Sequence, residues 1–352
     1  MTILLAQTVR VIVITTISFF VALFTAPFWY KFLKAKHFDK QLRDEATAPV
    51  FYELHKKKIG TPTGGGIIIW TTVVGLALFF GVMNKIFDGG VWSYLSFINR
   101  AETYLPLATL FFAALVGLFD DWLGALRIGG APGGGLKVRQ KSLLYLAIAI
   151  VGAWWFYYRL EWDVISVPFF GNFQIGWWYV PIFIFIIFAS AFSANETDGL
   201  DGLFGGVSIF TFLALTTVAF VLHRYDLAAF GGAVIGALLA FLWNNIYPAK
   251  FFMGDTGSMS LGITIGIVAM LTNTALLLPF FAIVLVIESV SVILQVASKK
   301  MRHGKKIFRS APIHHHFEAI GWLESQVTMR FWIISAVFAA LGLVIFFLSI
   351  SM

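Results

Sequence analysis

The chain has 352 residues, of which 59% are hydrophobic and only 12% are charged. Soluble domains carry roughly twice that share of charged residues, so this composition excludes an ordinary soluble protein and indicates an integral membrane protein. The formal net charge is +7, and the absence of cysteine excludes disulfide bonds and thiol catalysis.

Apolar stretches long enough to cross a bilayer as helices recur along the whole sequence, with no long polar block between them. We therefore predict an all-α polytopic membrane protein that forms a single domain over 1–352. The first stretch is longer than a signal-peptide core and its basic residues follow it, so we expect an uncleaved first span. The ten expected spans lie at 5–30, 64–83, 103–119, 142–158, 178–194, 204–222, 228–243, 258–275, 277–298 and 329–350.

Lysine and arginine are unevenly distributed between the two sides that these spans define. With Arg330 included, 20 of the 25 fall in the connections after the first, third, fifth, seventh and ninth spans. The positive-inside rule makes that side cytoplasmic and places both termini on the extracytoplasmic side. The expected cytoplasmic loops lie approximately at 31–63, 120–141, 195–203, 244–257 and 299–328. Anchoring to anionic lipid accounts for most of these basic residues.

Five aspartates gather on the same predicted face, although acidic residues contribute little to topology. They are Asp120 and Asp121 in FDDW, Asp198 and Asp201 in NETDGLDGL, and Asp255 in FFMGDTGS. Each alone is more simply explained as a solvated helix end. Together, crowded carboxylates repel one another, and a hard divalent cation such as Mg²⁺ would relieve that repulsion.

Two further motifs suggest phosphate chemistry. GDTGS is a tight turn whose backbone amides would begin the eighth span, and a helix N-terminus attracts anions; alternatively, Thr256 and Ser258 serve only as N-caps. The run His314 to His316 is poorly suited to zinc, because three consecutive histidines cannot face one ion from a helix and HExxH is missing. We expect the imidazoles to donate to phosphate or sugar oxygens, or else to cap the local loop.

The ordered set GTPTGGG, FDDW, NETDGLDGL, NNIYPAKFFMGDTGS and APIHHHFE resembles the phospho-N-acetylmuramoyl-pentapeptide branch of the polyprenyl-phosphate N-acetylhexosamine-1-phosphate transferases, over essentially the whole chain. The resemblance implies Mg²⁺-dependent transfer of phospho-MurNAc-pentapeptide from UDP-MurNAc-pentapeptide to undecaprenyl phosphate, which yields lipid I and UMP in peptidoglycan synthesis. A sister transferase that uses UDP-N-acetylglucosamine is the near alternative. A secondary transporter is the distant one, and it would carry its polar groups near the bilayer midplane.

The resemblance also implies residue roles. Asp255 would bind Mg²⁺, Asp120 and Asp121 would form the catalytic acidic pair, and His315 and His316 would act beside them. The expected substrate-binding residues are Lys58, Thr63, Lys141, Asn195, Asp198, Asp201, Asn245, Phe252 and His314. The chain departs from the family pattern at Gly64, Gly124, Phe192 and Glu196, where methionine, lysine, asparagine and leucine are usual.

The implied setting is the bacterial cytoplasmic membrane, with the active site facing the cytoplasm. A water-soluble sugar nucleotide and a lipid phosphate can meet only at that interface. The bilayer and both substrates are expected partners, the chain is expected to form a homodimer, and no nucleic acid is expected. Glu288 is the one acid placed deep in the membrane, and we expect it to be structural.

Overall fold

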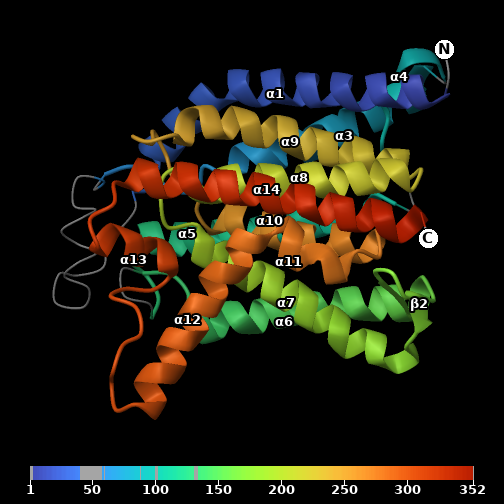
Figure 1. Cartoon of the computed structure of the whole chain (residues 1–352). Helices are drawn as coiled ribbons and strands as arrows, with labels where there is room; N and C mark the ends of the chain where they lie inside the picture. The colour runs from blue at the N-terminus through green and yellow to red at the C-terminus, as the bar shows by residue number, and fades with distance from the viewer. Residues whose placement is uncertain are drawn as a thin grey trace.

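The computed structural model describes residues 3–39, 58, 60–87, 89–99, 102–130 and 134–351. The helices are α1 (Ile3–Ala35), α3 (Ile67–Phe87), α4 (Gly90–Leu95), α5 (Tyr104–Ala125), α6 (Val138–Trp154), α7 (Tyr179–Thr197), α8 (Leu203–Val221), α9 (Tyr225–Asn245), α10 (Asp255–Leu271), α11 (Leu278–Phe281), α12 (Ile283–Met301), α13 (Ile313–Ala319) and α14 (Glu324–Ser351). Two short strands, β1 (Val164–Val167) and β2 (Gly171–Gln174), form an antiparallel hairpin. Both termini and the hairpin lie at one end of the bundle, and α13 lies at the other (Figure 1).

The helices confirm a polytopic membrane protein. Within the described ranges, eight helices are long and apolar enough to cross a membrane: α1, α3, α5, α6 with its continuation to Arg159, α7 with the preceding turn from Gly176, α8, α9 and α14. The expected eighth span corresponds to α10, which has only 17 residues. The remaining expected span, at 277–298, is not a straight helix.

That span is broken between α11 and α12. The segments Ala275–Phe281 and Ile283–Met301 meet at an angle of 89°. Pro279 lies in the first turn of α11, and Ala282 leaves the helical region with φ −127° and ψ 37°. Figure 1 shows α12 running obliquely away from the neighbouring helices. Hydropathy alone detects the apolar length of such a span and not its bend.

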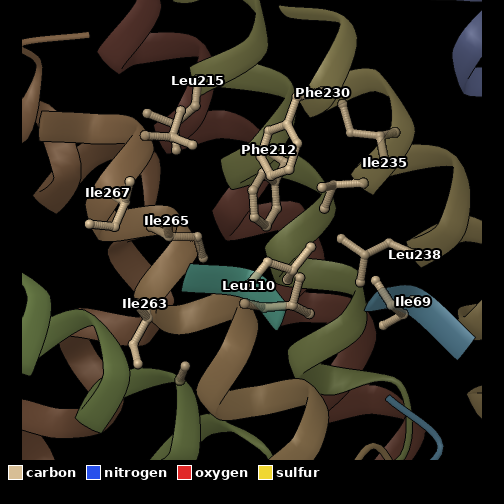
Figure 2. Packing of buried hydrophobic residues seen from close by; sticks show 14 of the residues in the cluster. Ile69, Leu110, Phe212, Leu215, Phe230, Ile235, Leu238, Ile263, Ile265 and Ile267 are labelled. Atoms are coloured by element: carbon tan, nitrogen blue, oxygen red, sulfur yellow. The ribbon is translucent and has the colours of Figure 1, made fainter. Parts of the chain in front are cut away.

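Helix α10 lies at the centre of the bundle. Every residue from Thr256 to Leu271 is buried. Figure 2 shows its isoleucines packed near apolar side chains of α5, α8 and α9. The hydroxyls of Ser260 and Thr264 donate to backbone oxygens four residues earlier, at 2.6 and 2.7 Å, which satisfies them inside the apolar core. This buried position fixes Asp255, the first residue of α10, against its neighbours.

The hairpin is a small departure from the all-α expectation. Its register pairs Val164 with Gln174 and Val167 with Gly171. Phe169 in the turn and Gly171 at the start of β2 have positive φ values of 68° and 91°. Strands of four residues are too short to give a clear alternation of polar and apolar positions, so the sequence pattern does not reveal them.

Candidate functional site

Asp121 connects α5 to the start of α10. Its two carboxylate oxygens accept hydrogen bonds from the backbone amides of Asp255 and Thr256, each at 3.0 Å. The first amides of a helix have no partner within the helix, so a carboxylate placed here caps the helix and suits its dipole. Asp121 is buried, and both of its oxygens are used by these two bonds. Asp121 therefore caps α10 and holds Asp255 in position.

Asp120 faces a different set of groups. Its Oδ1 accepts the backbone amide of Leu136 at 2.6 Å, and its Oδ2 lies 2.8 Å from the Lys141 ammonium. The same ammonium forms an ion pair with Asp255, whose other oxygen accepts the side-chain amide of Asn195 at 2.8 Å. Lys141 therefore stands between two carboxylates that come from different helices. This acid–lysine cluster unites four of the residues predicted from the sequence.

The acid–lysine cluster suits a divalent cation. Asp120 and Asp255 direct oxygens to one cationic position, which the Lys141 ammonium holds here. Mg²⁺ in proteins is often bound by one or two carboxylates, with substrate phosphates and water completing its shell. No group of three or more histidine, cysteine or acidic side chains with metal-binding geometry occurs within the described ranges.

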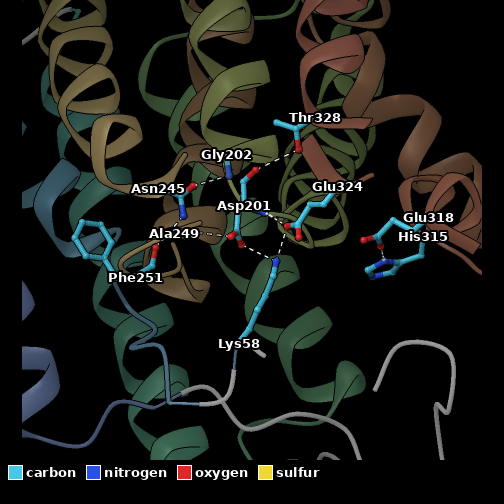
Figure 3. A network of polar contacts seen from close by, with 10 residues as sticks. All are labelled: Lys58, Asp201, Gly202, Asn245, Ala249, Phe251, His315, Glu318, Glu324 and Thr328. Atoms are coloured by element: carbon cyan, nitrogen blue, oxygen red, sulfur yellow. Dashed lines mark hydrogen bonds and ion pairs between the residues drawn. The ribbon is translucent and has the colours of Figure 1, made fainter. Parts of the chain in front are cut away.

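A second cluster forms around Lys58 (Figure 3). The Lys58 ammonium lies 2.7 Å from Asp201 Oδ1, pairs with Glu324, and is 5.7 Å from the centre of the Phe252 ring. The second oxygen of Asp201 accepts the backbone amide of Ala249 at 3.0 Å. The result is a cation held against an aromatic face and between two acids.

Glu324 is a member of this cluster that sequence reasoning missed. It begins α14, and its Oε1 also accepts the backbone amide of Asp201 at 2.7 Å. The available signal was its position, because it is an acid just before the long apolar stretch of the final span. Asn245 supports the same loop, with Oδ1 accepting the amide of Gly202 at 3.0 Å and Nδ2 donating to the oxygen of Phe251 at 2.8 Å.

The strap, residues 61–66 of the GTPTGGG motif, is paired with the loop that precedes α10. Three backbone hydrogen bonds of 2.8 to 2.9 Å join it to Phe252 and Met253. Thr63 accordingly lies beside the Phe252 loop, and its amide donates to Phe38. Because the same loop leads directly into Asp255, the strap connects the surroundings of Lys58 with the acid–lysine cluster.

The three consecutive histidines occupy three different environments. His314 is fully buried, and its Nδ1 lies 3.0 Å from Glu288 on α12. His315 is partly exposed, and its Nδ1 lies 2.7 Å from Glu318. His316 Nδ1 accepts the backbone amide of Arg309 at 3.1 Å. The second imidazole is thus oriented by a carboxylate, as a histidine that donates to a substrate would be.

His314 lies against the NETDGLDGL loop. An added Cβ on Gly199 would overlap its ring, so only glycine leaves room for the imidazole here. The Nε2 atom of His314 has no hydrogen-bond partner among the described residues. Burial alone would lower the pKa of His314, but the charge and hydrogen bond of Glu288 outweigh burial and raise it. That His314 binds the substrate stays a prediction, and its contacts in the structure tie α13 to α12 and to Gly199.

The remaining expected residues lie nearby. Asp198 ends α7 one turn after Asn195, and its amide donates to Ala194. Phe192, one of the departures from the family pattern, lies in the wall of an apolar groove of about 390 Å³ between α7, α10 and the α11–α12 bend. Ser193 and Ser289, whose hydroxyls are 2.5 Å apart, form part of the same wall. An apolar groove therefore starts next to the helix end that carries Asn195.

Comparison with known proteins adds independent findings. A family model described as Glycosyl transferase family 4 matches residues 103–273. The chain is 36% identical to a phospho-N-acetylmuramoyl-pentapeptide-transferase of Geobacillus thermodenitrificans over 339 residues, which cover 95% of this chain and 97% of the relative. It is 38% identical to a protein of that name from another Geobacillus over 332 residues, covering 94% and 95%. The Chloroflexus aurantiacus protein of that name is 35% identical over 359 residues, covering 97% and 90%.

Proposed function

Because this chain belongs to the phospho-N-acetylmuramoyl-pentapeptide transferase family, we propose that it transfers phospho-MurNAc-pentapeptide from UDP-MurNAc-pentapeptide to undecaprenyl phosphate at the acid–lysine cluster. The products are lipid I and UMP. The observation that carries the assignment to this site is the shared position of Asp120, Lys141 and Asp255 at the end of α5 and the start of α10. The protein acts as a multi-pass membrane transferase of peptidoglycan synthesis.

The surroundings of the cluster match both substrates. The apolar groove of about 390 Å³ reaches Ser193, two residues before Asn195 on α7, and would hold the start of a polyprenyl chain. On the polar side, Phe252 offers a ring for the uracil, and Lys58 lies over that ring. His315, oriented by Glu318, would donate to the sugar or the diphosphate.

Mg²⁺ is the proposed cofactor, with Asp255 and Asp120 as its protein ligands. The ion would supply charge neutralisation for phosphates that approach two carboxylates. The chain's own contribution begins with Asp121, which fixes Asp255 by capping α10. Lys141 then adds a positive charge that stays within reach of either carboxylate and can bind a phosphate oxygen.

The proposed reaction is a direct displacement at phosphorus. An oxygen of the lipid phosphate attacks the sugar-linked phosphorus, a new P–O bond forms, and the bond to the UMP oxygen breaks so that UMP leaves with the electron pair. A phosphate monoester with a second pKa near 6 is largely dianionic at pH 7, so no proton has to be removed first. Positioning and charge neutralisation then provide most of the catalysis.

The proposed setting is the bacterial cytoplasmic membrane, with the acid–lysine cluster facing the cytoplasm and both termini outside. The distribution of basic residues supports this orientation. A homodimer is proposed from the family resemblance. The acids of the two clusters lie near the end of α5 and at the starts of α10 and α14, which disfavours the transporter alternative, because a transporter would place its polar groups at mid-membrane depth.

The test is UMP release by detergent-purified protein with undecaprenyl phosphate, comparing UDP-MurNAc-pentapeptide with UDP-N-acetylglucosamine, each with Mg²⁺ and with EDTA. We expect metal-dependent release from the muramoyl substrate alone. Release only from UDP-N-acetylglucosamine would assign the chain to the sister branch. Asp163→Asn, in the hairpin region far from the cluster, is the control for variants of the catalytic acids and should remain fully active.

A further inference from the structure

A second cavity lies at the end of the bundle opposite the acid–lysine cluster. It has a volume of about 360 Å³ and is enclosed by the β1–β2 hairpin, the turns after α8 and α10, and the end of α14. Figure 1 shows the hairpin and the C-terminus together at this end, far from α13. No part of the proposed reaction uses this outer cavity.

Arg224 is the only charged side chain among the residues that the structure describes around the outer cavity. Its Nη1 donates to the oxygen of Leu271 at 2.6 Å, and its guanidinium carbon is 5.2 Å from the centre of the Trp162 ring. Within the described ranges no carboxylate lies within 4.0 Å of it. A half-buried guanidinium without an ion-pair partner is costly, and an anion would offset that cost.

The electrostatics of the outer cavity also favour the binding of an anion. Burial lowers the pKa of Arg224 from its ordinary value, and the more distant charge of Glu102 compensates only in part. Arg224 immediately precedes α9, but that helix start already carries Asp226 in its first turn and Glu102 as acceptor of the Leu227 amide at 3.3 Å, so the helix dipole there is largely matched. The positive charge of the outer cavity therefore comes from Arg224 itself, and no acid is among the described residues that line the cavity.

The other polar groups of the outer cavity are neutral hydrogen-bonding groups. Asn172 and Asn273 bring side-chain amides, and the hydroxyls of Thr272 and Thr274 are 2.7 Å apart. Ser166 and Ser349 add hydroxyls, and the remaining wall is apolar and comes partly from Phe346 near the end of α14. One cation, neutral donors and an apolar wall next to each other match an anion attached to a hydrocarbon chain.

We propose that the outer cavity binds the phosphate of a phospholipid, with Arg224 and the neighbouring amides on the phosphate oxygens and an acyl chain along the apolar wall. This site is separate from the transferase site and does not depend on the proposed reaction. The phosphate chemistry would also admit inorganic phosphate, and the experiment distinguishes the two sources.

The experiment is native mass spectrometry of the delipidated full chain titrated with dioleoyl phosphatidylglycerol, dioleoylglycerol or inorganic phosphate. We expect one tightly retained phosphatidylglycerol, no comparable retention of dioleoylglycerol, and only weak binding of inorganic phosphate. Arg224→Gln should weaken lipid binding by about tenfold or more, the loss expected for one charge-assisted hydrogen bond. Arg224→Lys should retain part of the affinity.

Asn172→Asp tests the proposal without touching the Arg224 contacts. The change is nearly isosteric on an exposed strand, and it supplies a carboxylate to the outer cavity, so it should weaken phosphatidylglycerol binding by a similar factor. Asn84→Asp, on α3 and outside the outer cavity, is the matched control and should bind as the wild type does. UMP release should be unchanged in both variants.

Equal retention of phosphatidylglycerol by Asn172→Asp and Asn84→Asp would overturn the outer-cavity site. Inorganic phosphate bound as tightly as the lipid would overturn the phospholipid assignment. Because these readouts measure binding and not turnover, they stay interpretable even if the enzyme proves to use another sugar nucleotide.

Discussion

Asp120 and Asp121 are neighbours in sequence, yet they meet different partners. Successive residues of a helix point about 100° apart, so one carboxylate faces the backbone of α10 and the other faces Lys141. The motif FDDW predicts where the pair lies but not which role each aspartate has. That division depends on which helix lies across from each carboxylate.

Asp120→Asn and Asp121→Asn should therefore fail in different ways. Asp120→Asn should lower UMP release by about a hundredfold or more, with little change in thermal stability, because it removes a charge that the proposed reaction uses beside the phosphates. Asp121→Asn keeps only one acceptor for two buried amides, so it should also cost roughly 1–3 kcal/mol of stability. Thermal unfolding in detergent measured beside UMP release distinguishes the two. Equal loss of stability in both variants would contradict the capping role.

His314 should make stability depend on pH. Its pKa is raised above the ordinary 6.5 by Glu288, with smaller contributions from Glu318 and Glu196, against the opposing effect of burial. A raised folded-state pKa gives stability that is fully present below pH 6.5 and is lost as the pH rises through the raised value.

The test compares thermal unfolding of wild type and Glu288→Gln from below pH 6.5 to alkaline pH. The wild type should lose stability on going to alkaline pH, and the variant should lose the part of this dependence that comes from His314. His223→Gln, which changes an exposed histidine at the opposite end of the bundle, should keep the wild-type slope. Identical slopes for all three proteins would remove His314 as the source.

At the scale of elements, the contact between α5 and α10 places the acids. Gly117 packs directly on the backbone of Asp255 and Thr256, and an added Cβ would overlap that backbone. Backbone atoms cannot move aside as a flexible side chain can, so the glycine sets how closely the two helices approach. Asp120 and Asp121 follow one turn later on the same helix, so the close approach of α5 and α10 also brings them near the start of α10.

Gly117→Ala should push α5 away from α10 and separate the acidic pair from Asp255. We expect UMP release to fall by about a hundredfold and stability to fall by roughly 1–3 kcal/mol, as for other overpacked interiors. Gly124→Ala is the matched control on the same helix, because an added Cβ there meets nothing within 4 Å. It should be neutral or slightly stabilising, since alanine favours helix more than glycine does. Equal effects of the two changes would show that close packing at Gly117 is not the cause.

Sequence patterns predicted some elements better than others. Long apolar stretches identified the helices, because the bilayer requires about twenty apolar residues per span. They did not reveal the bend at Ala282 or the hairpin, since neither changes the apolar content of the chain. The motifs located Asp255 and Lys58 but not Glu324, whose role depends on the position of the last helix relative to a loop more than 120 residues earlier.

On the scale of the whole molecule, the two ends of the bundle differ in chemistry. One end carries the acid–lysine cluster and the histidines, and the other carries the termini, the hairpin and the outer cavity. Basic residues are concentrated in the connections at the first end, which predicts that this end faces the cytoplasm.

The absence of cysteine makes that orientation easy to measure, because an introduced cysteine is the only thiol. Phe170→Cys, at an exposed position in the hairpin turn, should react with a membrane-impermeant maleimide in intact spheroplasts. Lys306→Cys, in the exposed loop between α12 and α13, should react only after permeabilisation. The reverse labelling pattern would invert the topology.

The strap that pairs with the Phe252 loop couples the Lys58 cluster to the acid–lysine cluster. Backbone hydrogen bonds hold 61–66 against the residues that lead into Asp255. If the proposed function holds, a nucleotide that orders the strap should also order Asp255, the proposed Mg²⁺ ligand, so the two binding events become cooperative. Linkage then requires reciprocity, and the factor by which the sugar nucleotide raises the affinity for Mg²⁺ must equal the factor by which Mg²⁺ raises the affinity for the nucleotide.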